Sequence, residues 1–367
     1  MESLALAVTL PSMPDAAHYL LAWPRALFVE EATAVLEKFI GPQVIDACTV
    51  LLQEAFCGRG PVLDFDAEAR GTFGSADAQR AFVRSLIDQA EKTPQQEDRP
   101  IWPDRHRVVG PAEMSDRRRQ LPRAFTDLVT DFHDRGYFAR SFGDSLHNLD
   151  PDLVLAERLR GPGLWPLRPA RWDEDTFYGL IEVLHDLVAR PRMSDRLPGL
   201  WQAPFYAVEA GRRLYRWRVN RLLDTAGIGL RLADTGDDAG RLVETVDPAR
   251  AELLDRVLVT PKAVAAGHVR HAIALFRGRG ADEDAKRSAI VTLGGVLEDR
   301  REMLKADLLR KDEGALFQIA NEFGLRHNRP GQRGDFDPVF LDWVFWWYLA
   351  TIELTDRLLA RPDQEGG

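Results

Sequence analysis

Residues 339–352 carry the sequence VFLDWVFWWYLATI, the longest apolar tract of the chain. Trp343, Trp346 and Trp347 lie at positions i, i+3 and i+4 within it, a spacing that brings side chains to one face of an α-helix. The tract is interrupted by Asp342 and is shorter than the roughly 20 residues that a membrane-spanning helix needs. It therefore predicts a helix whose tryptophan face is buried in a core or in a dimer interface.

Three further helical patterns precede this tract, separated by short breaks. Gly278-Arg279-Gly280 ends the first pattern, and Pro330-Gly331 comes before the last helix. Asp312 and Glu313 suit a helix N-terminus, because acidic side chains favour the positive end of the helix dipole. Helices joined by short connections are typical of a bundle. We expect four helices at about 261–276, 282–309, 312–325 and 338–360.

The break before the last helix carries a polar tripeptide, Arg326-His327-Asn328, followed by Arg329 and Arg333. Arginine stabilises the charge of a reacting phosphate and histidine exchanges protons near neutral pH, so these residues suit the binding or cleavage of a phosphodiester. They also suit an ordinary helix C-terminus, where cations favour the dipole and asparagine tolerates left-handed backbone. Three interpretations stay open: a helix end, a phosphate-binding site without catalysis, and a nuclease site.

The last hundred or so residues resemble a HEPN domain (higher eukaryotes and prokaryotes nucleotide-binding), an all-α bundle of four or five helices. The resemblance rests on four segments: Asp282 to Leu297, Lys311 to Phe317, Ile319 to His327, and Trp343 to Leu359. The upstream part is similar, more weakly, to large bacterial proteins that end in such a domain, some of them from abortive-infection systems. The resemblance implies an RNA- or nucleotide-binding protein of bacterial defence and a homodimer in which two motifs converge.

Ribonuclease members of that family carry an arginine, then a polar residue, and a histidine several positions later. Arg326 and His327 match the first half of this motif, whereas residues 331–333, where the distal histidine should fall, contain none. The resemblance implies a metal-independent ribonuclease with a degenerate motif; the alternative is a non-catalytic interaction or dimerisation module. It assigns catalysis to Arg326 and His327, and RNA contacts to Asn328, Arg329 and Arg333.

Upstream of the bundle, apolar residues recur at helical spacing in several stretches. One β-hairpin is expected where 229–233 and 240–246 flank the turn-forming Asp234-Thr235-Gly236-Asp237. The Pro/Gly-rich segment Gly161 to Pro166 marks a boundary. The helical stretches are Ala16 to Phe56, Arg123 to Gly136, Glu174 to Ala189, and Val208 to Asp224.

These patterns together predict a mainly α fold. We expect a helical N-terminal region at 1–160, a middle unit of helices and a β-hairpin at 161–257, a HEPN-like four-helix bundle at 258–361, and a frayed tail at 362–367.

Composition limits the partners of the chain. The formal net charge of −9 argues against binding nucleic acid over the whole surface, so any contact with a polyanion needs a local basic cluster. Cys48 and Cys57 lie in or beside one apolar stretch, which suits a reducing cytoplasm, and no positive residue precedes Leu4 to Leu10 as a secretory signal would require. We expect a cytoplasmic protein without a membrane span and without a cofactor.

Two clusters suggest metal ligands. His268 and His271 are spaced i, i+3 on a predicted helix, but no carboxylate or cysteine completes the set. Asp64, Asp66 and Glu68 would share one side of an extended segment, as a divalent-metal nuclease requires, although an exposed acidic loop explains them more simply. We predict no metal site.

The helix at 208–224 is dense in arginine and carries Trp217 among the arginines. Such a surface can grip nucleic acid by stacking and charge. Helical spacing puts Arg212 and Arg216 together and Arg218 on another face, which favours salt bridges between domains over an RNA track.

Overall fold

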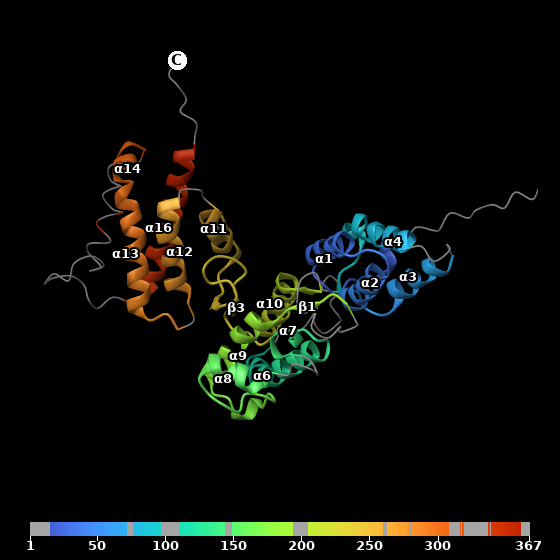
Figure 1. Ribbon diagram of the computed structural model, residues 1–367. Helices are drawn as coiled ribbons and strands as arrows, with labels where there is room; N and C mark the ends of the chain where they lie inside the picture. The colour runs from blue at the N-terminus through green and yellow to red at the C-terminus, as the bar shows by residue number, and fades with distance from the viewer. Residues whose placement is uncertain are drawn as a thin grey trace, which may run out of the picture. The chain divides into compact units, whose positions relative to one another are not determined.

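The computed structural model describes residues 15–71, 76–96, 110–143, 149–193, 205–259, 263–278, 280–307 and 339–360, together with Leu316, Gln318 and Asp337. The fold is mainly α-helical, as the sequence predicted, and its strands form two small antiparallel sheets in the described residues (Figure 1). The chain falls into two compact units, Met1–Gly227 and Ile228–Gly367. The three-part division at 160 and 257 stays a prediction beside this arrangement.

The first unit opens with helices that pack on one another: α1 (Arg25–Lys38), α2 (Pro42–Ala55), α3 (Gly60–Gly71) and α4 (Ala76–Asp88). Gly41, with φ of +56°, and Pro42 at the first position of α2 separate α1 from α2. Cys48 lies on the buried face of α2, where burial raises the pKa of its thiol to about 12. The short 3₁₀ helices η1 (Ala16–His18) and η2 (Ala90–Lys92) flank this group.

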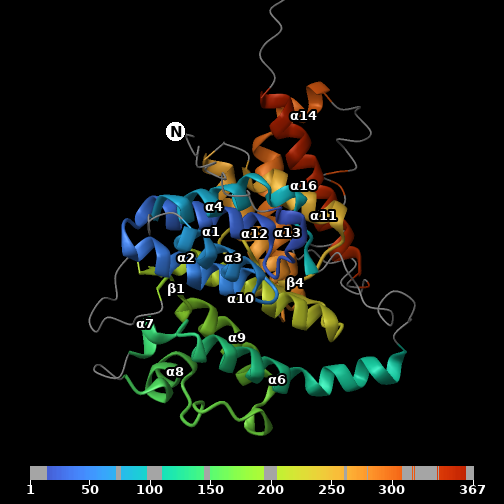
Figure 2. The same cartoon turned by 90° about the vertical axis from the view of Figure 1, so that its right-hand side faces the viewer.

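A second group of helices completes the unit. Within it α6 packs on α10 and α8 packs on α9, and α10 also contacts α1, so that α10 lies between the two groups (Figure 2). The carboxylate of Asp152 accepts hydrogen bonds from three backbone N–H groups of the Pro/Gly-rich segment, those of Gly163, Leu164 and Trp165. These bonds hold the segment against α8. The elements are α6 (Pro111–Asp134), α7 (Ala139–Phe142), α8 (Pro151–Leu159), η4 (Pro169–Arg171), α9 (Glu174–Leu187) and α10 (Val208–Thr225).

A two-stranded sheet that the sequence analysis did not predict joins β1 (Arg190–Pro191) to β2 (Tyr206–Ala207). It lies against α10 at Gly211, where an added Cβ atom would stand 2.6 Å from the backbone nitrogen of Arg190. Glycine is therefore needed there for the close approach of helix and strand. This contact fixes Arg190 inside the unit.

The second unit begins with the predicted hairpin. β3 (Leu230–Leu232) pairs with β4 (Leu242–Glu244) in the register Leu230 to Glu244, and Gly236 in the turn has φ of +81°. Left-handed backbone at a hairpin turn favours glycine, which explains why the sequence signal was reliable.

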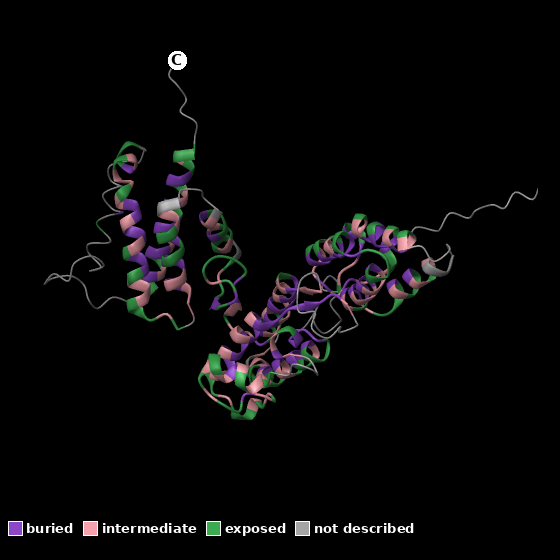
Figure 3. Cartoon of the chain, in the orientation of Figure 1, coloured by how far each residue is buried: buried purple, intermediate pink, exposed green. Residues whose placement is uncertain are grey.

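The helices of the second unit share one apolar core (Figure 3). They are α11 (Pro248–Val259), α12 (Ala263–Arg277), α13 (Glu283–Asp299), α14 (Arg301–Asp307) and α16 (Val339–Ala360). α11 was not predicted, and the expected helix at 282–309 is divided at Arg300, which caps α13. The expected helix at 312–325 lies outside the described residues except for Leu316 and Gln318.

The apolar tract at 339–352 forms the first part of α16, and its buried face differs from the one predicted. Val344, Phe345 and Tyr348 point into the core, whereas Trp343 is 49% exposed. Trp346 and Trp347 pack at the border of the core. The tryptophan spacing predicted the helix correctly. The face that is buried most deeply is formed by the neighbouring residues Val344, Phe345 and Tyr348 and not by the tryptophans. No helix among the described residues has the length and apolar character that crossing a membrane demands.

Candidate functional site

The residues predicted to bind or cut RNA, Arg326, His327, Asn328, Arg329 and Arg333, lie outside the described residues. The segment before them is fixed at one point. Leu316 is buried, and its carbonyl accepts a hydrogen bond of 2.9 Å from the hydroxyl of Tyr348 on α16. The start of the motif-bearing segment therefore contacts the core of the second unit.

The described residues form an open cleft of about 710 Å³ in the first unit, between α6, α10 and the C-terminal end of α2. Arg118, in the first half of α6, donates a hydrogen bond to the carbonyl of Gly227 beyond the end of α10, while Asp131, near the end of α6, pairs with Arg218. The two helices therefore run antiparallel. Residues at helical spacing line the cleft: Ala124, Asp127, Leu128, Asp131, Phe132 and Arg135 from α6 and its C-cap, and Leu214, Trp217, Arg218, Arg221, Leu222 and Thr225 from α10.

One carboxylate joins two cleft arginines. Asp131 accepts hydrogen bonds from Arg135 Nε at 2.8 Å and from Arg218 Nη1 at 2.6 Å. Burial alone would raise the pKa of Asp131, but the hydrogen bonds and charges of the two guanidinium groups outweigh it and hold that pKa below its usual value. Asp131 is thus ionised at neutral pH, and the group of Asp131, Arg135 and Arg218 carries one net positive charge.

Aromatic rings support these arginines. The Arg221 guanidinium lies 5.0 Å from the ring centre of Trp217, and that of Arg218 lies 5.6 Å from the ring centre of Phe132. Both are cation–π contacts. Trp217 is half-buried and lines the cleft, so it offers a planar aromatic surface beside cationic groups.

Glu54, which lines the cleft, belongs to a buried network of charged side chains. Arg190 is fully buried, and it donates from Nε to Glu54 Oε2 at 2.8 Å and from Nη1 to Glu31 Oε1 at 3.0 Å. Arg192 adds two hydrogen bonds to the carboxylate of Glu31, of 2.7 and 2.9 Å. Two arginines therefore face two glutamates, which satisfies the rule that buried charges occur in pairs.

Tyr137 extends this network to the cleft. Its hydroxyl donates a hydrogen bond of 3.0 Å to Glu54 Oε2, and both residues line the cleft. Burial, reinforced by the negative charge of Glu54, raises the pKa of Tyr137 well above its usual value. Tyr137 therefore stays a neutral donor.

The sequence analysis did not identify Glu31, Glu54, Tyr137 or Arg190. Arg190 and Glu54 are 136 positions apart in the chain, and no local spacing links them. The usable signal was weak: an arginine directly before Pro191, at the end of an apolar helix pattern.

The arginine-rich helix α10 makes ion pairs, as the sequence analysis favoured, and two of them join the predicted middle unit, 161–257, to the predicted N-terminal region, 1–160. Arg213 pairs with Glu30 of α1, Arg218 pairs with Asp131, and Arg212 pairs with Glu209 on the same helix. The ion pairs of Arg213 and Arg218 join α10 to α1 and α6, and Arg218 lines the cleft.

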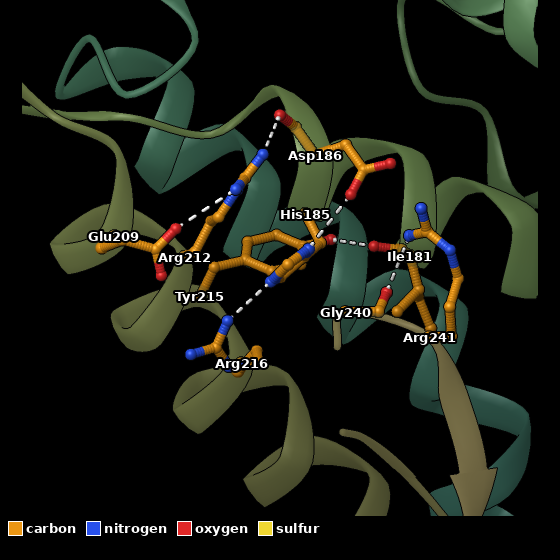
Figure 4. A network of polar contacts seen from close by, with 9 residues as sticks. All are labelled: Ile181, His185, Asp186, Glu209, Arg212, Tyr215, Arg216, Gly240 and Arg241. Carbon is orange, nitrogen blue, oxygen red and sulfur yellow. Dashed lines mark hydrogen bonds and ion pairs between the residues drawn. The ribbon is translucent and has the colours of Figure 1, made fainter. Parts of the chain in front are cut away.

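On the other side of α10, His185 forms a buried polar network (Figure 4). Its Nε2 accepts a hydrogen bond of 3.0 Å from Arg216 Nη1, and its Nδ1 faces Asp186 Oδ1 at 3.3 Å. Burial, with the nearby positive charges of Arg216 and Arg212, lowers the pKa of His185 to about 4 although Asp186 opposes the shift. The imidazole is therefore neutral at pH 7 and serves to join α9 to α10.

The residues of the two candidate metal clusters lie on helices. His268 and His271 are exposed on α12, and Asp64, Asp66 and Glu68 belong to α3, where the segment is helical and not extended. Asp64 accepts a hydrogen bond of 2.6 Å from the Tyr19 hydroxyl. Across the described part of the chain, no three histidine, cysteine, aspartate or glutamate residues are grouped to hold a metal ion.

The cleft therefore brings together an accessible tryptophan, three arginines and three carboxylates in the first unit. Comparison of the chain with protein-family models, with curated proteins and with solved structures gives no match.

Proposed function

We propose that the chain binds a nucleotide in the cleft between α6 and α10. The main support for this proposal is that Trp217, Arg135 and Arg218 line the same cleft. The cleft has a volume of about 710 Å³, which suits a small ligand. A base stacks on an aromatic ring whatever its sequence, and guanidinium groups bind phosphate oxygens in a two-pronged geometry. Arg135 and Arg218 are both partly exposed, so each can turn a donor toward a phosphate.

The charge balance of the cleft favours a nucleotide over a long polyanion. Its lining holds Arg135, Arg218 and Arg221 against Glu54, Asp127 and Asp131, so the formal charges cancel. A nucleic acid track needs a positive surface that follows the backbone. A nucleotide, by contrast, presents a phosphate to arginine and hydroxyl or amino donors to carboxylates.

The wider proposal is an RNA- or nucleotide-binding role in bacterial defence, with a second site in the HEPN-like C-terminal segment. The resemblance of Arg326-His327 to the family's motif supports it. We further propose that the second unit forms a homodimer, which the exposed Val339, Phe340 and Trp343 at the start of α16 support.

Ribonuclease activity is tested by incubating tRNA and single-stranded RNA with the intact protein in EDTA. Cleavage that disappears in the double variant Arg326→Ala, His327→Ala supports the enzyme. An intact protein that does not cut leaves the non-catalytic binding or dimerisation module as the better description of the second unit.

Nucleotide binding is tested by titrating the four nucleoside triphosphates into the full chain, followed by calorimetry and by tryptophan fluorescence. Arg218→Gln should weaken binding about tenfold or more, because a hydrogen bond to a charged group contributes roughly 1.5–3 kcal/mol. Arg213→Gln is the matched control, since Arg213 lies on the same helix, pairs with Glu30 and does not line the cleft. Absence of binding, or equal loss in both variants, would contradict the proposal.

A further inference from the structure

Glu54 is one of the carboxylates that line the cleft, and one of its two oxygens accepts no hydrogen bond from the described residues. Its side chain is only 9% exposed, and Oε2 accepts two hydrogen bonds, from Arg190 Nε and from the Tyr137 hydroxyl. Among the described residues, Oε1 receives none. Glu54 lines the cleft, and its Oε1 is not fully buried. A carboxylate oxygen can accept two hydrogen bonds, so Oε1 is a vacant acceptor.

This acceptor is held rigidly. Rotation of Glu54 away from the cleft wall would leave Arg190, which is fully buried, with one carboxylate instead of two. The Tyr137 hydroxyl holds the same oxygen from a second direction. A ligand therefore meets a carboxylate that is already oriented, and little conformational entropy is lost when it binds.

The chemistry of the acceptor limits which part of a nucleotide can lie on it. A carboxylate repels a phosphate group and accepts hydrogen bonds from hydroxyl or amino groups. The phosphate of the ligand would therefore bind to Arg135 and Arg218 and not to Glu54. Burial alone would lower the pKa of Arg135, but the Asp131 contacts and then the nearby negative charge of Glu54 outweigh it and raise that pKa. In a nucleotide, the donors between base and phosphate are the ribose hydroxyls.

The cleft lining offers a group for each part of such a ligand: Trp217 for the base, Arg135 and Arg218 for the phosphate, and Glu54 for the sugar. A carboxylate that accepts from ribose hydroxyls is the arrangement by which proteins commonly recognise this sugar.

We propose that the ligand of the cleft is a ribonucleotide and that Glu54 Oε1 accepts hydrogen bonds from its ribose hydroxyls. This inference rests on the proposed nucleotide-binding function. It adds that the site distinguishes ribonucleotides from deoxyribonucleotides, and that it does so through one residue.

The test compares ATP, GTP, CTP and UTP with the 2′-deoxy form of each, titrated into the full chain. We expect at least about tenfold weaker binding of the deoxy forms, since a hydrogen bond to a charged acceptor is lost. Glu54→Gln should reduce the difference to about threefold or less. Tyr137→Phe, which removes a hydrogen bond to Oε2 without changing charge, should reduce it partially and serves if Glu54→Gln does not fold.

The outcomes separate the two proposals. If no nucleotide binds, the nucleotide-binding function fails and the inference with it. If ribo and deoxy forms bind equally, the function stands and the inference is overturned. A ribose preference that survives both variants, or a preference for one base without a preference for its sugar, also overturns it, because Glu54 would then not contact the ribose.

Discussion

The stability of the first unit should depend on pH through His185. In the folded chain its pKa is lowered to about 4, first by burial and then by Arg216 and Arg212, whereas an unfolded chain has an ordinary histidine pKa of about 6.5. Between these values the unfolded state binds a proton that the folded state does not. The free energy of unfolding therefore falls as pH drops from about 6.5 toward 4 and is unaffected by His185 above that range.

The magnitude follows from the two pKa values. Between pH 7.5 and pH 5 the linkage relation gives a loss of about 2 kcal/mol, and the full loss below pH 4 is about 3 kcal/mol. Because the His185 side chain is 3% exposed, solvent screening reduces this value little. A marginally stable protein loses a large fraction of its stability over such a range.

The variant His185→Gln isolates this effect, because glutamine can accept from Arg216 and donate to Asp186 but does not titrate. Urea unfolding at pH 7.5, 6.5, 5.5 and 5.0, followed by tryptophan fluorescence, should show the parent losing about 2 kcal/mol more than the variant. His18→Gln serves as a control, since His18 is 79% exposed, and should retain the parental dependence. Parallel curves for the parent and His185→Gln would refute the assignment of a depressed pKa to this histidine.

Two further substitutions test the packing around the cleft. Arg190→Met should lower the free energy of unfolding by about 3–5 kcal/mol, because it leaves the buried Glu54 without its ion-pair partner; denaturant midpoints measure this, and a change below about 1 kcal/mol would contradict it. Gly211→Ala should cost about 1–3 kcal/mol, since the new Cβ meets the backbone of Arg190, while Gly267→Ala on α12, where nothing lies within 4 Å, should be neutral or stabilising by the same measurement.

The sequence predicted those parts of the fold whose causes are local. Helices around 16–56, 174–189 and 208–224 were found because apolar side chains recur at helical spacing, and the hairpin because Gly236 must adopt a left-handed backbone. The division of the helix at Arg300 was missed, because the apolar pattern continues through it. The β1–β2 sheet was missed because strands of two residues show no periodicity.

The cleft could not be predicted because its residues are joined by packing and not by spacing. The arginines of α10 were visible in the sequence, but Asp131 and Glu30, which bind two of them, lie on other helices. Likewise nothing in the sequence around Glu54 indicates Arg190, whose approach depends on the contact of β1 with α10 at Gly211. The site that sequence patterns did suggest, at 326–333, lies outside the described residues.

The acidic balance of the chain and the arginine-lined cleft have one explanation. Three buried or half-buried arginines of the first unit have carboxylate partners: Arg190 has Glu54 and Glu31, Arg192 has Glu31, and Arg218 has Asp131. Such pairing holds the arginines in place and cancels the field that would attract a long polyanion. What remains is local: one net positive charge around Asp131 and one vacant oxygen on Glu54. A ligand that satisfies both carries an anionic group and hydroxyl or amino donors, and the proposed ribonucleotide has both.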